Sequence, residues 1–149
     1  MVAQGVTHWV TQGVTQSLLQ LSLVIVGVVH LLPGLGALGA DRLEQLYGVG
    51  VSDPSLLLLL QHRAVLFAVI GSLCLTATIV VPLRLPALLM ALISVLAYLL
   101  LSRSLGPVST ELARVATVDL WLLPVLAVGL SAWFASLETA TSTNPSTAL

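Results

Sequence analysis

Charged side chains are scarce in this chain. Only 7% of its 149 residues are Asp, Glu, Lys or Arg, and lysine does not occur at all. A soluble domain carries roughly a quarter of such residues. Hydrophobic residues make up 58% of the chain, and its mean hydropathy is +1.09. The polar surface needed to cover the core of a water-soluble monomer is therefore missing, and that class of protein is excluded.

Other features are also absent. With five arginines against six acidic residues, the chain has no basic surface for nucleic acid, whose binding depends on Lys and Arg against phosphate. The single cysteine, Cys74, excludes an internal disulfide and every paired-cysteine motif. Hydrolase, zinc-protease and P-loop motifs are missing. The glycines at 34, 36 and 39 have the spacing of a dinucleotide-binding GxGxxG motif, but they follow a predicted membrane helix, whereas that motif follows a strand. These absences favour a noncatalytic protein.

Four apolar runs are long enough to cross a bilayer, which needs about 20 helical residues per span. They cover about 17–38, 54–81, 85–102 and 110–137. We therefore predict an all-α membrane protein, an antiparallel bundle of four transmembrane helices spanning 17–138. Residues 1–16 are polar but uncharged, so they lack the positive start of a secretory signal and are expected to be retained. Residues 139–149 are rich in Thr and Ser and are expected to be disordered.

A short helix is predicted between the first two spans, from Asp41 to Gly48. Asp41 has the position of an N-cap and Gly48 that of a helix stop. Apolar side chains fall on one side of this helix and polar ones on the others, as expected of a helix in the headgroup layer; the two sets are Leu43, Leu46 and Tyr47, and Arg42, Glu44 and Gln45. The alternative is an ordinary connector with a few apolar residues. Asp53 and Pro54 then begin the second span as N-cap and first helical residue.

The distribution of arginine predicts the orientation of the bundle. Four spans place both termini on one side of the membrane. The very short turn at 82–86 lies on that same side, and the two longer connections lie on the other. Arg42, Arg103 and Arg114 lie toward the opposite side, against Arg84 in the short turn. Because Lys and Arg accumulate in cytoplasmic loops, both termini are predicted to be periplasmic.

Four histidine, arginine or aspartate side chains lie deep enough in the predicted spans to need compensation in hydrocarbon, and they are His30, His62, Arg63 and Asp119. Each lies roughly 12 to 13 Å from the same end of its helix at 1.5 Å per residue, so we expect them to share one layer. Ionisable groups at this depth normally face the bundle interior or a wet cavity. The arrangement that costs least pairs Arg63 with Asp119 and lets a histidine complete the hydrogen bonds.

The backbone around this layer is expected to be closely packed and irregular. Gly27 and Gly34 flank His30, and Gly71 lies two turns beyond Arg63, so helices can approach closely there. Pro33 removes a helical hydrogen bond and frees the carbonyl four residues earlier. Irregular backbone in a membrane is tolerated mainly where it lines a cavity.

Three interpretations of the layer stay open. It is a structural clamp that fixes helix register, a binding pocket or proton-linked site, or a haem site with His30 and His62 as the iron ligands. In the pocket, Arg63 donates to an anion or carbonyl, Asp119 orients it, and the histidines respond to protons. Glu111 and Arg114, three residues apart, are expected to form a solvated pair, while Tyr98 is expected to anchor or pack.

The segments GVVHLLPGLGALGADRLEQLYGV and DPSLLLLLQHRAVLFAVIGSL resemble the DoxX-like group of small bacterial four-helix membrane proteins. This resemblance covers roughly the first half of the chain. It implies a multi-pass protein of the bacterial inner membrane, with relatives described as accessory subunits of quinone-linked redox complexes or left without an assigned function. Some relatives are labelled phosphopantetheine adenylyltransferase, but this chain has neither a soluble nucleotide-binding fold nor a charged phosphate site.

We therefore expect a noncatalytic accessory or lipophilic-ligand-binding subunit of a membrane complex. The alternative is a haem-binding redox protein or a proton-coupled transporter that uses the same polar layer. No metal or cofactor is expected apart from haem or quinone in these two interpretations. The expected partners are the lipid bilayer and either another membrane protein or further copies of this chain.

Overall fold

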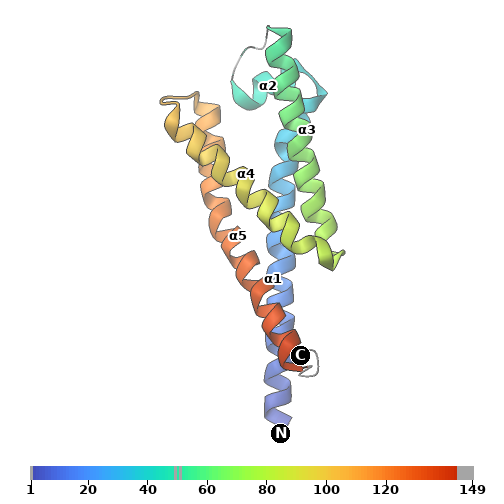
Figure 1. The fold of residues 1–149 in the computed structure, drawn as a ribbon. Helices are drawn as coiled ribbons and strands as arrows, with labels where there is room; N and C mark the ends of the chain where they lie inside the picture. The colour runs from blue at the N-terminus through green and yellow to red at the C-terminus, as the bar shows by residue number, and fades with distance from the viewer. Residues whose placement is uncertain (1, 49, 51, 144–149) are drawn as a thin grey trace.

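The computed structural model describes residues 2–48, 50 and 52–143, with side chains described between 10 and 139. Within those ranges the chain forms helices and no strand, and the helices are α1 (Val2–Gly34), η1 (Leu35–Leu38), α2 (Ala40–Tyr47), α3 (Pro54–Ala77), η2 (Val81–Leu83), α4 (Arg84–Ser104) and α5 (Thr110–Thr143) (Figure 1). In this part of the chain α1, α3, α4 and α5 are long and apolar enough to cross a membrane. The predicted all-α bundle of four membrane helices is confirmed.

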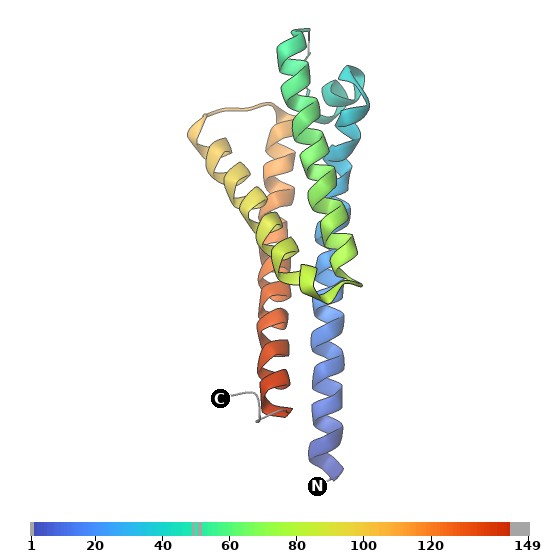
Figure 2. The same cartoon turned by 45° about the vertical axis from the view of Figure 1, so that its right-hand side comes forward.

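The helix α1 is the centre of the bundle. Both α3 and α5 pack along it, and α4 runs obliquely from the end of α3 to the start of α5 (Figures 1 and 2). The first turns of α1 and the last turns of α5 lie at the same end of the molecule. Toward the opposite end α4 leans away from α3 (Figure 2). The bundle is therefore closed at the short turn between α3 and α4 and wider where α2 lies.

Glycines bring α1 and α3 together, as the sequence predicts. A methyl group on Gly71 would lie 2.7 Å from the carbonyl oxygen of Gly27 and 2.8 Å from Cγ of Leu31. A methyl group on Gly34 would lie 3.0 Å from Cβ of Ala68. No side chain fits between the two backbones at these points, because such distances are shorter than normal van der Waals contact.

The end of α1 follows from Pro33. The α-helix ends one residue later, at Gly34, and the chain continues as the 3-10 turn η1. The irregular ending expected from this proline is present. It places α2 across the wide end of the bundle, where its Leu43 is fully buried.

The caps of α2 and α3 agree with the sequence in all but one case. Gly48 ends α2 in the left-handed conformation, and its N–H donates to the carbonyl of Glu44. Asp53 accepts from the N–H of Ser55 at the start of α3, 2.9 Å away. The predicted N-cap at Asp41 is wrong, because Gly39 holds that position and Asp41 lies in the first turn.

Arg84 closes the narrow end of the bundle. Its guanidinium and Nε donate to the carbonyls of Ala77 and Thr78 and to Oε1 of Gln16 on α1. Only 7% of the residue is exposed, so it is not the free loop charge assumed in the orientation argument. Its bonds satisfy the carbonyls of Ala77 and of the C-cap Thr78. The helix α3 ends at Ala77, whereas the sequence predicts a span that continues to residue 81.

The two longest helices extend beyond their predicted limits. The helix α1 begins at Val2 rather than near 17, since no proline or strong cap interrupts 2–16. The helix α5 continues to Thr143, into the segment where disorder is expected, and 144–149 lie outside the described residues. Polar side chains near the start of α1 and the end of α5 line a common small cavity, and they are Gln12, Thr15, Gln16, Ser136 and Thr139. The extended part of each helix therefore packs beside the other, and neither segment by itself predicts this contact.

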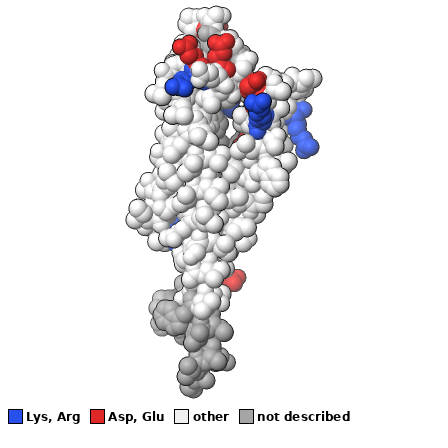
Figure 3. Space-filling model, turned by 180° about the vertical axis from the view of Figure 1, so that it is seen from behind, with Lys and Arg blue, Asp and Glu red and all other residues white. Residues whose placement is uncertain are grey.

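Charge and apolar surface are separated along the molecule. Large aliphatic side chains are exposed on every long helix, as expected of surface in contact with lipid rather than water. Red and blue side chains gather at the end where α2 lies, and the middle of the molecule is nearly free of them (Figure 3). The charged end therefore corresponds to one membrane surface.

Replacing Gly71 with alanine should weaken the crossing of α1 and α3. The new methyl group must displace the backbone of α1, which costs about 1 to 3 kcal/mol in a well-packed core. The measurement is the free energy of unfolding in mixed micelles titrated with denaturing detergent. Gly13→Ala is the matched control, since no atom lies within 4 Å of its added methyl. Equal stability of the two variants would contradict the close crossing.

Candidate functional site

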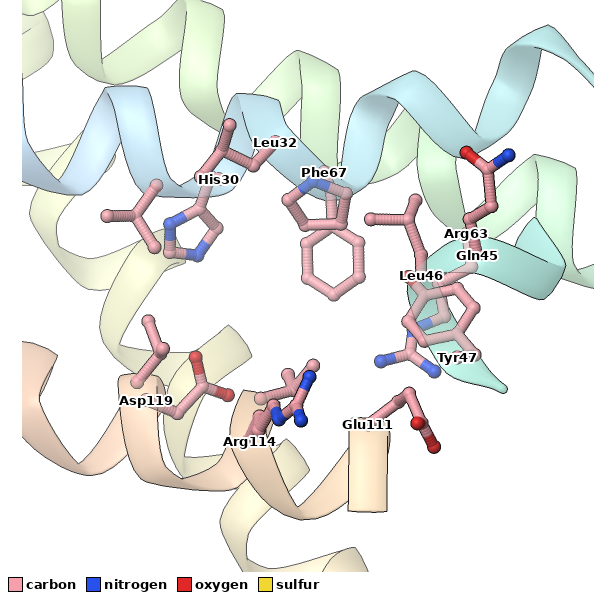
Figure 4. A pocket seen from close by; sticks show the side chains of 14 residues that line it. His30, Leu32, Gln45, Leu46, Tyr47, Arg63, Phe67, Glu111, Arg114 and Asp119 are labelled. Carbon is pink, nitrogen blue, oxygen red and sulfur yellow. The ribbon is translucent and has the colours of Figure 1, made fainter. Parts of the chain in front are cut away.

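A cavity of about 260 Å³ opens at the wide end of the bundle. The helices α1, α2, α3 and α5 all contribute to its wall, and its polar lining consists of His30, Gln45, Tyr47, Arg63, Glu111, Arg114 and Asp119. The three side chains from α5 form one side of the cavity, and those from α1, α2 and α3 form the other (Figure 4). Three of the four predicted layer residues, namely His30, Arg63 and Asp119, therefore share one cavity.

The guanidinium of Arg63 is surrounded by aromatic rings. Its Cζ lies 5.1 Å from the ring centre of Phe67, 5.3 Å from that of Tyr98 and 5.5 Å from that of Tyr47. These rings come from α3, α4 and α2. Each ring face attracts a cation by about 0.5 to 2 kcal/mol, depending on desolvation. Among the residues whose side chains are described, no carboxylate lies in direct contact with Arg63, so the rings supply its stabilisation.

The beginning of α5 holds two of these rings in place. The hydroxyl of Tyr98 donates to the carbonyl of Leu112, 2.9 Å away. Ser109 donates to the carbonyl of Tyr47 and also accepts from the N–H of Leu112. It therefore caps α5 and ties α2 to it. The aromatic enclosure and the first turn of α5 form one connected unit.

Tyr47 is the member of this unit that comes from α2. Only 4% of it is exposed, and burial raises the pKa of its hydroxyl above the usual value, while the charge of Arg63 acts in the opposite direction. The phenol therefore stays neutral at physiological pH. Its aromatic face remains available to the guanidinium.

His30 forms the deep wall of the cavity and is only 4% exposed. Its Nδ1 lies 2.9 Å from the carbonyl of Val26, one turn earlier in α1. A carbonyl only accepts, so Nδ1 carries the hydrogen, and Nε2 of the neutral ring is an acceptor. The ring also contacts Phe67 edge to face, with centres 6.0 Å apart. From the sequence, Pro33 is expected to free the carbonyl of Val29 beside His30. The partner of the His30 ring is the carbonyl of Val26 instead.

Asp119 lies across the cavity from Arg63 and within its electrostatic range. The direct ion pair expected between them is not found. Among the described residues, no salt bridge within 4.0 Å joins any of the four charged side chains of the cavity, which are Arg63, Glu111, Arg114 and Asp119. The charges face one shared space instead of each other.

His62 does not belong to this group. It is exposed on α3 and does not line the cavity. Consecutive residues of a helix point about 100° apart, so the inward position of Arg63 turns its neighbour toward the surroundings. The expected common layer therefore includes His30, Arg63 and Asp119 without His62.

Four residues of the site were not selected from the sequence. Glu111 and Arg114 line the cavity rather than forming the expected solvated pair, and Phe67 and Tyr98 enclose Arg63. The spacing of residues 111, 115 and 119 places Glu111 on the face of α5 that carries Asp119, which is a signal present in the sequence. Nothing in the sequence connects Tyr98 with Arg63.

The predicted short helix lies at the mouth of the cavity. Asp41, Arg42 and Glu44 are exposed on its outer side, and Arg42 donates to Oε1 of Gln45 at 3.3 Å. Tyr47 points inward, as the division of polar and apolar faces predicts. This helix therefore covers the aromatic enclosure with one face and presents charge on the other.

The arrangement does not fit a haem held by His30 and His62. One imidazole is buried in the cavity wall, whereas the other is exposed on α3, so the two do not face a common iron position. Between residues 10 and 139, apart from the gaps at 49 and 51, no group of three or more His, Cys, Asp or Glu side chains has the geometry of a metal site.

No protein-family model, curated protein or solved structure matches this chain.

Replacing Gly48 with alanine should distort the mouth of the cavity. Its φ is +63°, a conformation that costs a side-chain-bearing residue about 1 to 2 kcal/mol. The added methyl group would also collide with the carboxylate of Glu111. We expect a loss of that size in the free energy of unfolding, measured in mixed micelles. Gly50→Ala is the control, because nothing lies within 4 Å of its methyl. An unchanged Gly48→Ala variant would show that α2 and α5 do not meet there.

Proposed function

We propose that this small integral membrane protein is a noncatalytic subunit that binds the polar head of a lipophilic molecule. The head occupies the cavity lined by His30, Arg63 and Asp119, and the apolar bundle accommodates the rest of the ligand. Arg63 donates to an anionic or carbonyl oxygen of the head. Asp119 accepts from a donor on it.

One observation carries this proposal. The four charged side chains line a single cavity, yet no salt bridge within 4.0 Å joins them in the ranges that the structure describes. Charges at membrane depth need compensation. A clamp that only fixed register would bring Arg63 and Asp119 into direct contact. Unpaired charges around a shared space suit a polar ligand that contacts several of them at once.

The apolar core argues against a path for protons across the whole bundle. From the level of His30 toward Arg84 the buried core consists almost wholly of aliphatic side chains, among them Leu23, Val26 and Leu126. A proton relay needs a chain of titratable groups or water through this region. Binding is therefore the function that the cavity supports best.

The setting of this protein is also a proposal. The DoxX-like resemblance of 27–49 and 53–73 supports a place in the bacterial inner membrane, as an accessory subunit of a complex linked to quinone metabolism. The arginine distribution supports a cytoplasmic cavity mouth and periplasmic termini. Partners are either another membrane protein or further copies of this chain.

Arg63→Leu should greatly reduce ligand retention while the protein stays folded. Loss of one charge-assisted hydrogen bond reduces affinity by about tenfold or more. Native mass spectrometry of gently extracted protein measures noncovalently bound molecules above the 15.6 kDa chain. We expect an adduct on the wild type, much less of it on Arg63→Leu and on Asp119→Asn, and helical circular dichroism in all three.

Arg103→Leu is the matched control, because Arg103 is an exposed arginine outside the cavity lining. It should retain the adduct fully. Unfolding of Arg63→Leu together with a ligand-free wild type would establish the clamp instead. Equal adducts on wild type and Arg63→Leu would show that the cavity is not the binding site.

A further inference from the structure

Building on the proposed function, we propose that the ligand is a phospholipid whose head carries both a phosphate and a primary ammonium group. One of its acyl chains leaves the polar cavity past Arg63 and lies in a groove between α3 and α4.

The groove is a second cavity of about 510 Å³. Its lining is mainly aliphatic and includes Leu66, Ile70, Met90, Ile93, Ala97 and Leu101. Most of these side chains are exposed, so the groove opens sideways to the surroundings of the bundle. In a bilayer those surroundings are hydrocarbon chains.

The groove and the polar cavity adjoin each other. Arg63 and Phe67 line both of them. The guanidinium therefore stands where a charged cavity meets an apolar groove. A single molecule that fills both must be polar at one end and apolar at the other.

The direction of the groove matches that of a membrane lipid. One part of the groove runs roughly 10 to 12 Å from Arg63 to Ile70 along α3 and from Tyr98 to Met90 along α4, at 1.5 Å per residue. The other part, lined by Leu105, Val108 and Leu112, lies at the wide end of the bundle. The paths along α3 and α4 both lead away from the charged end of the molecule (Figures 1 and 3). The head would therefore lie near the membrane surface and the chain would point toward the middle of the bilayer.

The charges of the cavity select the head. Arg63 and Arg114 provide planar donors, which suit phosphate oxygens. Glu111, Asp119 and Nε2 of His30 are acceptors, and a primary ammonium has three N–H groups to donate. An anionic head leaves both carboxylates facing negative charge. A quinone ring offers only acceptors and leaves the carboxylates unpaired.

The test is a competition among lipids that share the same acyl chains. Delipidated protein in detergent is mixed with equal amounts of phosphatidylethanolamine, phosphatidylcholine and phosphatidylglycerol, together with a long-chain isoprenoid quinone, and bound lipid is read by native mass spectrometry. We expect phosphatidylethanolamine to be retained about tenfold better than phosphatidylcholine, whose quaternary ammonium has no N–H to donate. The preference should disappear in Asp119→Asn.

A second pair of variants tests the groove. Ala97→Trp fills the groove and should reduce binding of phosphatidylethanolamine about tenfold. Glycerophosphoethanolamine has the same head without acyl chains, so its ability to compete should be the same in Ala97→Trp as in the wild type. Ala127→Trp, at another exposed alanine on α5, should bind like the wild type. Circular dichroism of both variants verifies that they fold.

The outcomes separate this inference from the proposed function. Retention of the quinone or of phosphatidylglycerol in place of phosphatidylethanolamine, dependent on Arg63, would overturn the lipid assignment and leave the cavity as a binding site. Equal binding by Ala97→Trp and Ala127→Trp would overturn the groove. If no lipid or quinone is retained in a way that depends on Arg63, both proposals are overturned.

Discussion

The structure depends on how a single guanidinium is compensated at the wide end of the bundle. Arg63 lies among the rings of Tyr47, Phe67 and Tyr98, so an aromatic enclosure replaces the carboxylate that usually neutralises a charge in a membrane protein. The rings come from three helices. The hydroxyl of Tyr98 donates to the carbonyl of Leu112, and the backbone carbonyl of Tyr47 accepts from the hydroxyl of Ser109 at the start of α5. This one charge therefore lies where α2, α3 and α4 meet the start of α5.

The enclosure also explains why the cavity is polar and open. Because the rings already stabilise Arg63, Asp119 is not drawn into direct contact with it. The carboxylate remains on the opposite wall, beside Arg114 and Glu111 from the same helix. A contact ion pair would have used both charges and closed the space between α3 and α5. The open site therefore follows from the stabilisation of Arg63 by the faces of aromatic rings and not by a carboxylate.

The sequence predicted the fold and the depth of the site, because both follow from distances along single helices. Apolar length defined the four spans, and counting residues placed His30, Arg63 and Asp119 at one level. The direction of each side chain was harder. The pair His62 and Arg63 could not both face inward, since neighbours on a helix diverge by about 100°, but hydropathy did not decide which one would. The role of Tyr98 depends on the oblique path of α4, which no local pattern encodes.

The widening of the bundle is a fixed feature of the fold, because both of its ends are held by bonds to backbone carbonyls. At the closed end, Arg84 joins the last carbonyls of α3 to Gln16 of α1. At the wide end, the hydroxyl of Tyr98 holds α4 to the carbonyl of Leu112. Such carbonyls lie at helix termini or accept an additional bond, so they are available without breaking a helix. With α4 fixed at both ends on different neighbours, it must cross obliquely, and the space between α3 and α4 is built into the connectivity.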